Sequence, residues 1–290
     1  MTIVYYTTGI SGTGRLVRGL AIARALERNG IDARFVFLHS SDQERLLAPY
    51  SQVKIPIEHE STLAPGAYEE STLYRTLVRL APDILLVDLM WFTLHHFIAS
   101  LPCKKVFLTR QTSPEFFSIP FKNHPLRFDS APYDLLLATE PYPCPVNYHH
   151  LNPIVIRNRE EILPAGEAAL KLNLDPKKPH CLFSLNLEKV EFQRAAEKYA
   201  RLEHEGYQIF YSSLFQGGVF PIVNFFNTFD FIVCGGGYNA FWETVFFQKK
   251  AEYIAVPTRF ENQQWRIDRC RDYTFTQNGA DELLGLLMNL

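Results

Sequence analysis

The sequence predicts an α/β protein built from two doubly wound domains that face a cleft. Short apolar runs alternate with segments of helical periodicity, and this alternation occurs in both halves of the chain. Residues 141–153, rich in proline, tyrosine and histidine, separate the halves as a hinge would. A chain of 290 residues with 47% apolar side chains can bury two cores. We therefore expect an N-terminal domain over residues 1–152 and a C-terminal domain over 153–290.

In the first half we expect a strand at 2–8, a glycine loop at 9–14 and a helix at 15–28. Further strands are expected at 33–38, 84–87, 105–108 and 134–138, and a helix at 68–80. The run at 84–87 is apolar without alternation, which is typical of a strand buried on both faces of a parallel sheet.

In the second half we expect strands at 181–185, 208–211, 229–234 and 253–256, helices between them, and a last helix near 281–289. Ligands of such folds bind beyond the carboxyl ends of the strands. The loops at the strand ends are therefore the segments in which to look for a site.

Composition excludes several classes of function. The formal net charge is -2 and neither half is basic, which argues against nucleic acid as a partner. No apolar run reaches the length of a membrane span, and the N-terminus lacks the basic region of a signal peptide. The five cysteines are scattered without a C-x-x-C pair, as in reduced cytoplasmic proteins. We expect a cytoplasmic protein that binds no metal.

The first glycine loop contains Gly12, Thr13 and Gly14 between a strand and a helix. It lacks the third glycine and the downstream acid of a dinucleotide-binding fingerprint, and Arg15 stands where a P-loop has lysine. Two explanations stay open: a turn that brings backbone amides close to a ligand at a helix N-terminus, or a turn needed only for strand–helix packing.

The second glycine segment is more informative. A buried strand ends in Gly235, Gly236 and Gly237, and a helix is expected to start near Asn239, a residue that favours N-caps. Glycines at a helix N-terminus let a diphosphate approach the backbone amides. Glu243 lies one turn further on, where its carboxylate could accept the hydroxyls of a ribose; a solvated helix acid is the simpler alternative.

A third segment follows the strand at 253–256. It contains Arg259, Gln263 and Gln264, and amide side chains suit sugar hydroxyls because they both donate and accept hydrogen bonds. A polar first turn of a helix explains the same residues without a ligand.

These segments together resemble the GT-B glycosyltransferases, in particular predicted transferases allied to the enzyme that adds N-acetylglucosamine to lipid I, with a C-terminal domain like that of glycosyltransferase family 28. Residues 12–26 (GTGRLVRGLAIARAL) are similar to the family's G-x-G-H-x-x-R…L-A-x-A-x-x-L, and residues 82–88 (PDILLVD) to its P-D-x-x-x-x-D strand. The segments GGYNA…E at 236–243, VP at 256–257 and E-x-Q…R at 261–266 resemble its donor site.

The resemblance implies two Rossmann-like domains and a nucleotide-sugar donor, usually UDP-linked, held by the C-terminal domain without a metal or other cofactor. It implies that Gly236 and Gly237 approach the diphosphate, that Glu243 holds the ribose, and that Gln263 and Gln264 face the donor sugar. The acceptor is left open between a glycan, a lipid-linked molecule and a small molecule. Peripheral contact with a membrane stays open as well.

Catalysis needs a base near the acceptor hydroxyl. Asp88 is the candidate, because it ends a buried strand, although an aspartate that caps a helix explains it equally well. The glycine-loop amides, with Arg259 or Arg15, would stabilise the leaving group.

Two departures from the family pattern leave other functions open. Arg15 replaces the family's histidine and cannot act as a base, and Asn186 stands where a pair of glycines is common. A nucleotide-sugar hydrolase on the same fold and a catalytically degenerate nucleotide-sugar-binding protein are therefore the alternatives to a transferase.

Overall fold

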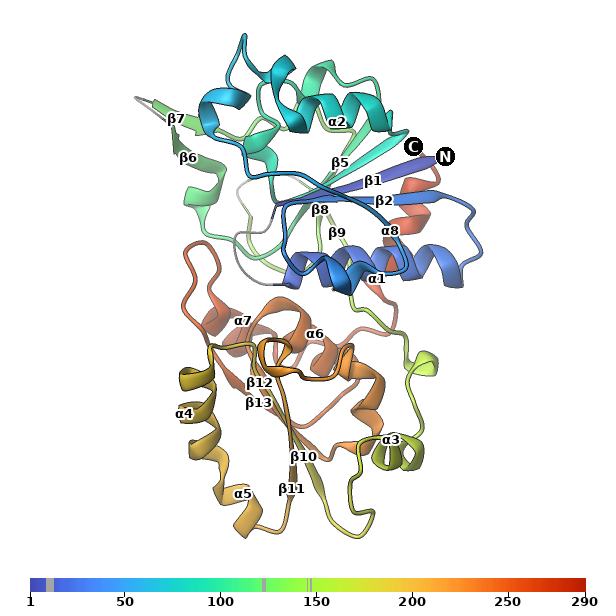
Figure 1. Ribbon diagram of the computed structural model, residues 1–290, viewed down its shortest axis with the longest axis vertical. Helices are drawn as coiled ribbons and strands as arrows, with labels where there is room; N and C mark the ends of the chain where they lie inside the picture. The colour runs from blue at the N-terminus through green and yellow to red at the C-terminus, as the bar shows by residue number, and fades with distance from the viewer. Residues whose placement is uncertain (9–12, 122–123, 145, 147) are drawn as a thin grey trace. The chain divides into compact units, whose positions relative to one another are not determined.

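The computed structural model describes residues 1–8, 13–121, 124–144, 146 and 148–290. The chain divides into two compact units (Figure 1). Unit 1 comprises Met1–Ile154, Arg259–Asn262 and Gln277–Leu290, and unit 2 comprises Val155–Thr258 and Gln263–Thr276. The expected division after residue 152 lies two residues from this boundary. The end of the chain and residues 259–262, however, group with unit 1 rather than with the second domain.

Unit 1 contains a parallel sheet of seven strands in the order β3-β2-β1-β4-β5-β8-β9. The strands are β1 (Thr2–Thr7), β2 (Arg34–His39), β3 (Ser51–Lys54), β4 (Ile84–Asp88), β5 (Lys104–Thr109), β8 (Leu135–Ala138) and β9 (His149–His150). A separate antiparallel hairpin joins β6 (Ser118–Phe121) to β7 (His124–Arg127). The strand order reverses between β1 and β4, so this pair forms the switch point at which ligands of such sheets bind.

Three α-helices accompany this sheet: α1 (Gly14–Arg28), α2 (Thr72–Leu80) and α8 (Gly279–Leu287). Gly19 lets α1 approach the sheet, since a Cβ there would lie 2.6 Å from the ring of Tyr5. The last helix lies beside α1, where Arg28 and Asp281 form an ion pair of 2.8 Å (Figure 1). Short 3-10 turns connect several of the elements.

Unit 2 is built on a second parallel sheet, of order β11-β10-β12-β13. Its strands are β10 (His180–Ser184), β11 (Gln208–Ser212), β12 (Phe231–Gly235) and β13 (Ala251–Ile254). Its helices are α3 (Ala165–Lys171), α4 (Lys189–Tyr199), α5 (Arg201–His204), α6 (Tyr238–Phe246) and α7 (Gln263–Cys270). The order reverses between β10 and β12, which places a switch point where the second glycine segment begins.

The predicted fold class of two doubly wound, Rossmann-like α/β domains is confirmed, and the differences are local. The helix expected at 68–80 is a 3-10 turn followed by α2, because the Ser71 side chain accepts a hydrogen bond from Tyr74 N and starts the helix there. The segment expected to be a hinge contains β9, which pairs with β8 and belongs to unit 1.

Candidate functional site

The glycine segment of unit 2 exposes the beginning of a helix. Strand β12 ends at Gly235, and Gly237 is the N-cap of α6, a residue that has no side chain with which to cap the helix. The first turn of α6 carries no acidic residue, so no charge of its own offsets the helix dipole there. The expectation that Asn239 is the N-cap is wrong: Gly237 has the extended backbone of a cap, and Asn239 lies inside the first turn.

Different constraints explain why glycine occupies positions 235, 236 and 237. A Cβ at Gly236 would lie 2.8 Å from Ile267 Cδ1 of α7, so helix packing requires glycine there. At Gly235 and Gly237 the nearest atoms would be 3.6 and 3.7 Å away, which is ordinary contact. None of the three has a positive φ. Neither strain nor packing explains Gly235 and Gly237, whereas a ligand close to the backbone would.

Glu243 lies on the second turn of α6 and is only 7% exposed. Among the residues that the structure describes, no donor forms a hydrogen bond or ion pair with its carboxylate. Burial raises the pKa of Glu243 to about 8. A buried carboxyl group without a partner is costly in a protein that binds nothing there. The alternative of a solvated helix acid is therefore wrong for Glu243.

Helix α7 supplies one predicted residue to this region and directs another away from it. Gln263 is buried, and its Oε1 accepts a hydrogen bond of 2.9 Å from Val256 N. Gln264 is exposed, and its Nε2 donates to Asp268 within α7. Its expected role toward a donor sugar finds no support in this arrangement and stays a prediction.

Sequence reasoning missed Arg266, a buried side chain of α7 that is 0% exposed. Its Nη1 donates a hydrogen bond of 2.9 Å to the carbonyl of Gly236, and its guanidinium lies 5.7 Å from the ring centroid of Tyr238. This arginine fixes the backbone of the glycine segment. The signal was present in the sequence, since Arg266 ends the segment that resembles the donor site.

Arg259 belongs to unit 1, and its predicted part in stabilising the leaving group stays a prediction. The arginine is exposed, and its guanidinium lies 4.8 Å from the ring centroid of Phe260.

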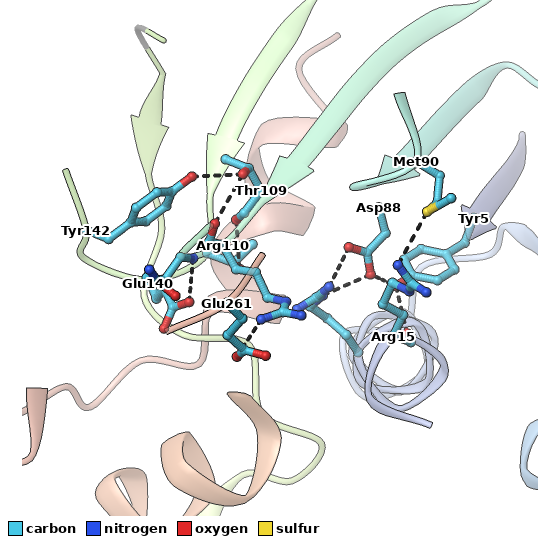
Figure 2. Close-up of polar contacts among 12 residues, drawn as sticks. Tyr5, Arg15, Asp88, Met90, Thr109, Arg110, Glu140, Tyr142 and Glu261 are labelled. Atoms are coloured by element: carbon cyan, nitrogen blue, oxygen red, sulfur yellow. Dashed lines mark hydrogen bonds and ion pairs between the residues drawn. The ribbon is translucent and has the colours of Figure 1, made fainter. Parts of the chain in front are cut away.

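The carboxyl end of β4 carries a buried ion pair (Figure 2). Asp88, 0% exposed, accepts hydrogen bonds from Arg18 Nε at 2.9 Å and Arg18 Nη2 at 2.5 Å. The hydroxyl of Tyr5 contacts the same carboxylate, and burial, followed by the charge of Asp88, raises the pKa of Tyr5. Both oxygens of Asp88 are thus engaged. This geometry favours a structural role over the predicted base role, which stays untested.

Arg15 lies on the first turn of α1 near this pair. It is half-buried, its Nη1 contacts the sulfur of Met90 at 3.3 Å, and burial lowers its pKa (Figure 2). Thr13 is the N-cap of α1 and makes no side-chain capping bond, and Gly14 begins the helix. Gly12 lies outside the described residues, so its predicted part in the loop stays a prediction.

A second cluster of polar residues lies after strands β5 and β8 in unit 1. Arg110 and Glu261 form an ion pair of 2.5 Å, and Glu140 accepts a hydrogen bond of 2.6 Å from Gln111 N (Figure 2). Gln111 in turn accepts a bond of 2.7 Å from Asn262 N. Sequence reasoning missed this group because its members come from three separate segments.

Within the described ranges, no group of three or more histidine, cysteine, aspartate or glutamate side chains has the geometry to hold a metal ion. In the same part of the chain, no helix has the length and apolarity needed to span a membrane.

The fold is similar to that of several solved glycosyltransferases. The Streptomyces sp. SF2575 glycosyltransferase SsfS6 in complex with thymidine diphosphate matches with a TM-score of 0.58 at 13% identity, over 89% of this chain and 82% of that one. The spinosyn forosaminyltransferase SpnP matches with 0.57 at 13% identity, over 100% and 90%. MurG of Acinetobacter baumannii matches with 0.52 at 13% identity, over 99% and 90%. The chain has the fold of the GT-B glycosyltransferases. No family model and no curated protein matches its sequence, so the GT-B likeness rests on structure.

Proposed function

We propose that this chain is a glycosyltransferase that takes a sugar from a nucleotide sugar, with unit 2 holding the nucleotide. The observation that carries the proposal is Glu243, a buried carboxyl group on α6 without a hydrogen-bond partner among the described residues, in a helix whose N-cap is Gly237. The two hydroxyls of a ribose would supply the donors that the carboxylate lacks. Hydrogen bonds to a charged acceptor are among the stronger ones, so this contact would contribute to affinity.

The diphosphate would bind at the start of α6, as anions do at helix N-termini. Gly235 and Gly237 leave the approach to the backbone unobstructed, and the hydrogen bond from Arg266 engages the carbonyl of Gly236. The same amides would stabilise the charge that develops on the leaving diphosphate, so the proposed transfer needs no metal ion.

We further propose a pyrimidine nucleoside diphosphate as the carrier. The resemblance described above implies a UDP-linked donor, and SsfS6 was solved with thymidine diphosphate. Gln263, buried beside the glycine segment, would contact the donor sugar.

Isothermal calorimetry in the presence of EDTA tests the proposal, with UDP, UDP-N-acetylglucosamine, dTDP and GDP as probes. We expect binding of a pyrimidine diphosphate, at least tenfold weaker in Glu243→Gln, since such a bond is worth about 1.5–3 kcal/mol. Glu197→Gln is the matched control, because Glu197 is an exposed acid on α4 of the same unit. No binding by any of the four probes would overturn the proposal.

Turnover then separates the alternatives. Release of UDP from a UDP-sugar that depends on an added acceptor supports a transferase, and release in water alone identifies a hydrolase. Binding without any release identifies a catalytically degenerate nucleotide-sugar-binding protein.

A further inference from the structure

Three arginines lie at the carboxyl edge of the unit 1 sheet, and two of them form an ion pair with a carboxylate. Arg18 pairs with Asp88 and Arg110 pairs with Glu261. Arg15 is close enough to both arginines to feel their charge, and no carboxylate among the described residues forms an ion pair with it. A thioether is a weak acceptor, so the contact with Met90 does not compensate a half-buried guanidinium. The charge of Asp88 acts to raise the pKa of Arg15, but the Asp88 carboxylate is bonded to Arg18 and Tyr5, so no described carboxylate contacts Arg15 directly.

A buried hydroxyl lies at the end of the strand that precedes α1. Thr7 ends β1, is 1% exposed, and its Oγ1 has no hydrogen-bond partner among the described residues. Alternation along the strand places Thr7 on the same face as Tyr5. That face is the one covered by α1, since the Tyr5 hydroxyl reaches the carbonyl of Arg15 at 2.7 Å. Among the described residues, a hydroxyl without a hydrogen-bond partner and a cation without an ion pair thus belong to the same face and the same edge of the sheet.

Among the residues that the structure describes, each histidine or acid at the end of a neighbouring strand already has a hydrogen-bond partner. His39 contacts Gln52 and Ser41 N, Asp88 binds Arg18, and Glu140 accepts from Gln111 N. His150 ends β9, three strands from β4 and so about 14 Å away. Residues 9–12, beyond the described ranges, contain neither an acid nor a histidine.

We propose that the acceptor of this enzyme supplies its own negative charge: an oxyanion, either a carboxylate or a phosphate, binds Arg15 and Thr7. The inference rests on the proposed transferase function and narrows its acceptor. A lone pair of the bound oxyanion forms the bond to the anomeric carbon of the donor. The bond from that carbon to the β-phosphate oxygen breaks, and the nucleoside diphosphate leaves with the electron pair. No proton moves, so the step needs no base, and the product is a glycosyl ester or a glycosyl phosphate.

Direct binding is the first test, with benzoate and phenyl phosphate as anionic probes and benzyl alcohol as the neutral one. We expect Arg15→Gln to weaken binding of at least one anion by about tenfold or more, and Arg15→Lys to recover part of it. Thr7→Val should weaken binding as well without loss of stability, because it removes an unpartnered buried hydroxyl. Arg34→Gln is the matched control, since Arg34 is exposed at the amino end of β2. Equal binding to the wild type and Arg15→Gln would overturn the inference.

Turnover with UDP-glucose, UDP-N-acetylglucosamine and dTDP-glucose is the second test. We expect benzoate or phenyl phosphate to stimulate release of the nucleotide and benzyl alcohol not to do so. A product cleaved by hydroxylamine identifies the carboxylate, and one cleaved by phosphatase identifies the phosphate. Benzyl alcohol as the equal or better acceptor would overturn the inference and leave the transferase standing. A protein that binds no nucleotide would overturn the proposed function, whatever its anion affinity.

Discussion

The buried carboxyl group of Glu243 leads to a prediction in which stability and binding change in opposite directions. Burial raises its pKa from the ordinary value of 4.5 to about 8. The native state therefore holds a proton that the unfolded chain has released between these two values, so this group lowers stability as the pH rises from 4.5 to 8. At about 1.4 kcal/mol per pH unit, the cost above pH 8 is on the order of 3 to 5 kcal/mol. At pH 4 there is no cost, because both states are protonated.

Glu243→Gln keeps the shape of the side chain and removes this titration. Urea denaturation should give the variant a free energy of unfolding higher by on the order of 3 kcal/mol at pH 8.5, and close to that of the wild type at pH 4.5. Affinity of the wild type for a UDP-sugar should rise between pH 6.5 and 8.5 as Glu243 ionises, whereas the variant should bind weakly at every pH. A variant that is less stable at pH 8.5 would refute the reasoning, because it would show that the carboxylate is paired in the native protein.

Five further substitutions test the fold and the site. Gly279→Ala should lower the free energy of unfolding by about 2–4 kcal/mol, because the new Cβ would lie 1.8 Å from a backbone oxygen. Gly285→Ala should raise the free energy of unfolding by up to about 1 kcal/mol in the same urea titration, because no atom lies within 4 Å of its Cβ. Asp88→Asn should cost about 3–5 kcal/mol, because its buried arginine partner loses a counter-ion; a stable variant that has lost only turnover would restore the base role. Gly237→Ala should weaken UDP binding in calorimetry at nearly unchanged stability, whereas Gly236→Ala should destabilise the protein, because only its Cβ overlaps α7.

Local patterns predicted the strands and helices well, and the reason is physical. Unbroken apolar runs such as 84–87 occur where a strand is buried on both faces, and β4 is such a strand. Strand β3, hairpin β6–β7 and the short β9 were not predicted, because none of them is an unbroken apolar run like that of β8. Helix α8 was predicted in place, but not in its unit, since helical periodicity does not indicate which core a helix covers.

For the candidate site, too, some features could be predicted from the sequence and others only from the structure. The sequence by itself determined that glycines follow a buried strand and precede a helix that carries Glu243, because turn and helix chemistry are encoded within a few residues. Only the tertiary structure decided that, among the described residues, Glu243 is buried without a partner, Asp88 is paired with Arg18, and Arg15 is not paired with a carboxylate. Asp88 and Arg18 are 70 positions apart. Such contacts arise from the order in which strands assemble into a sheet, and no local pattern of residues carries that order.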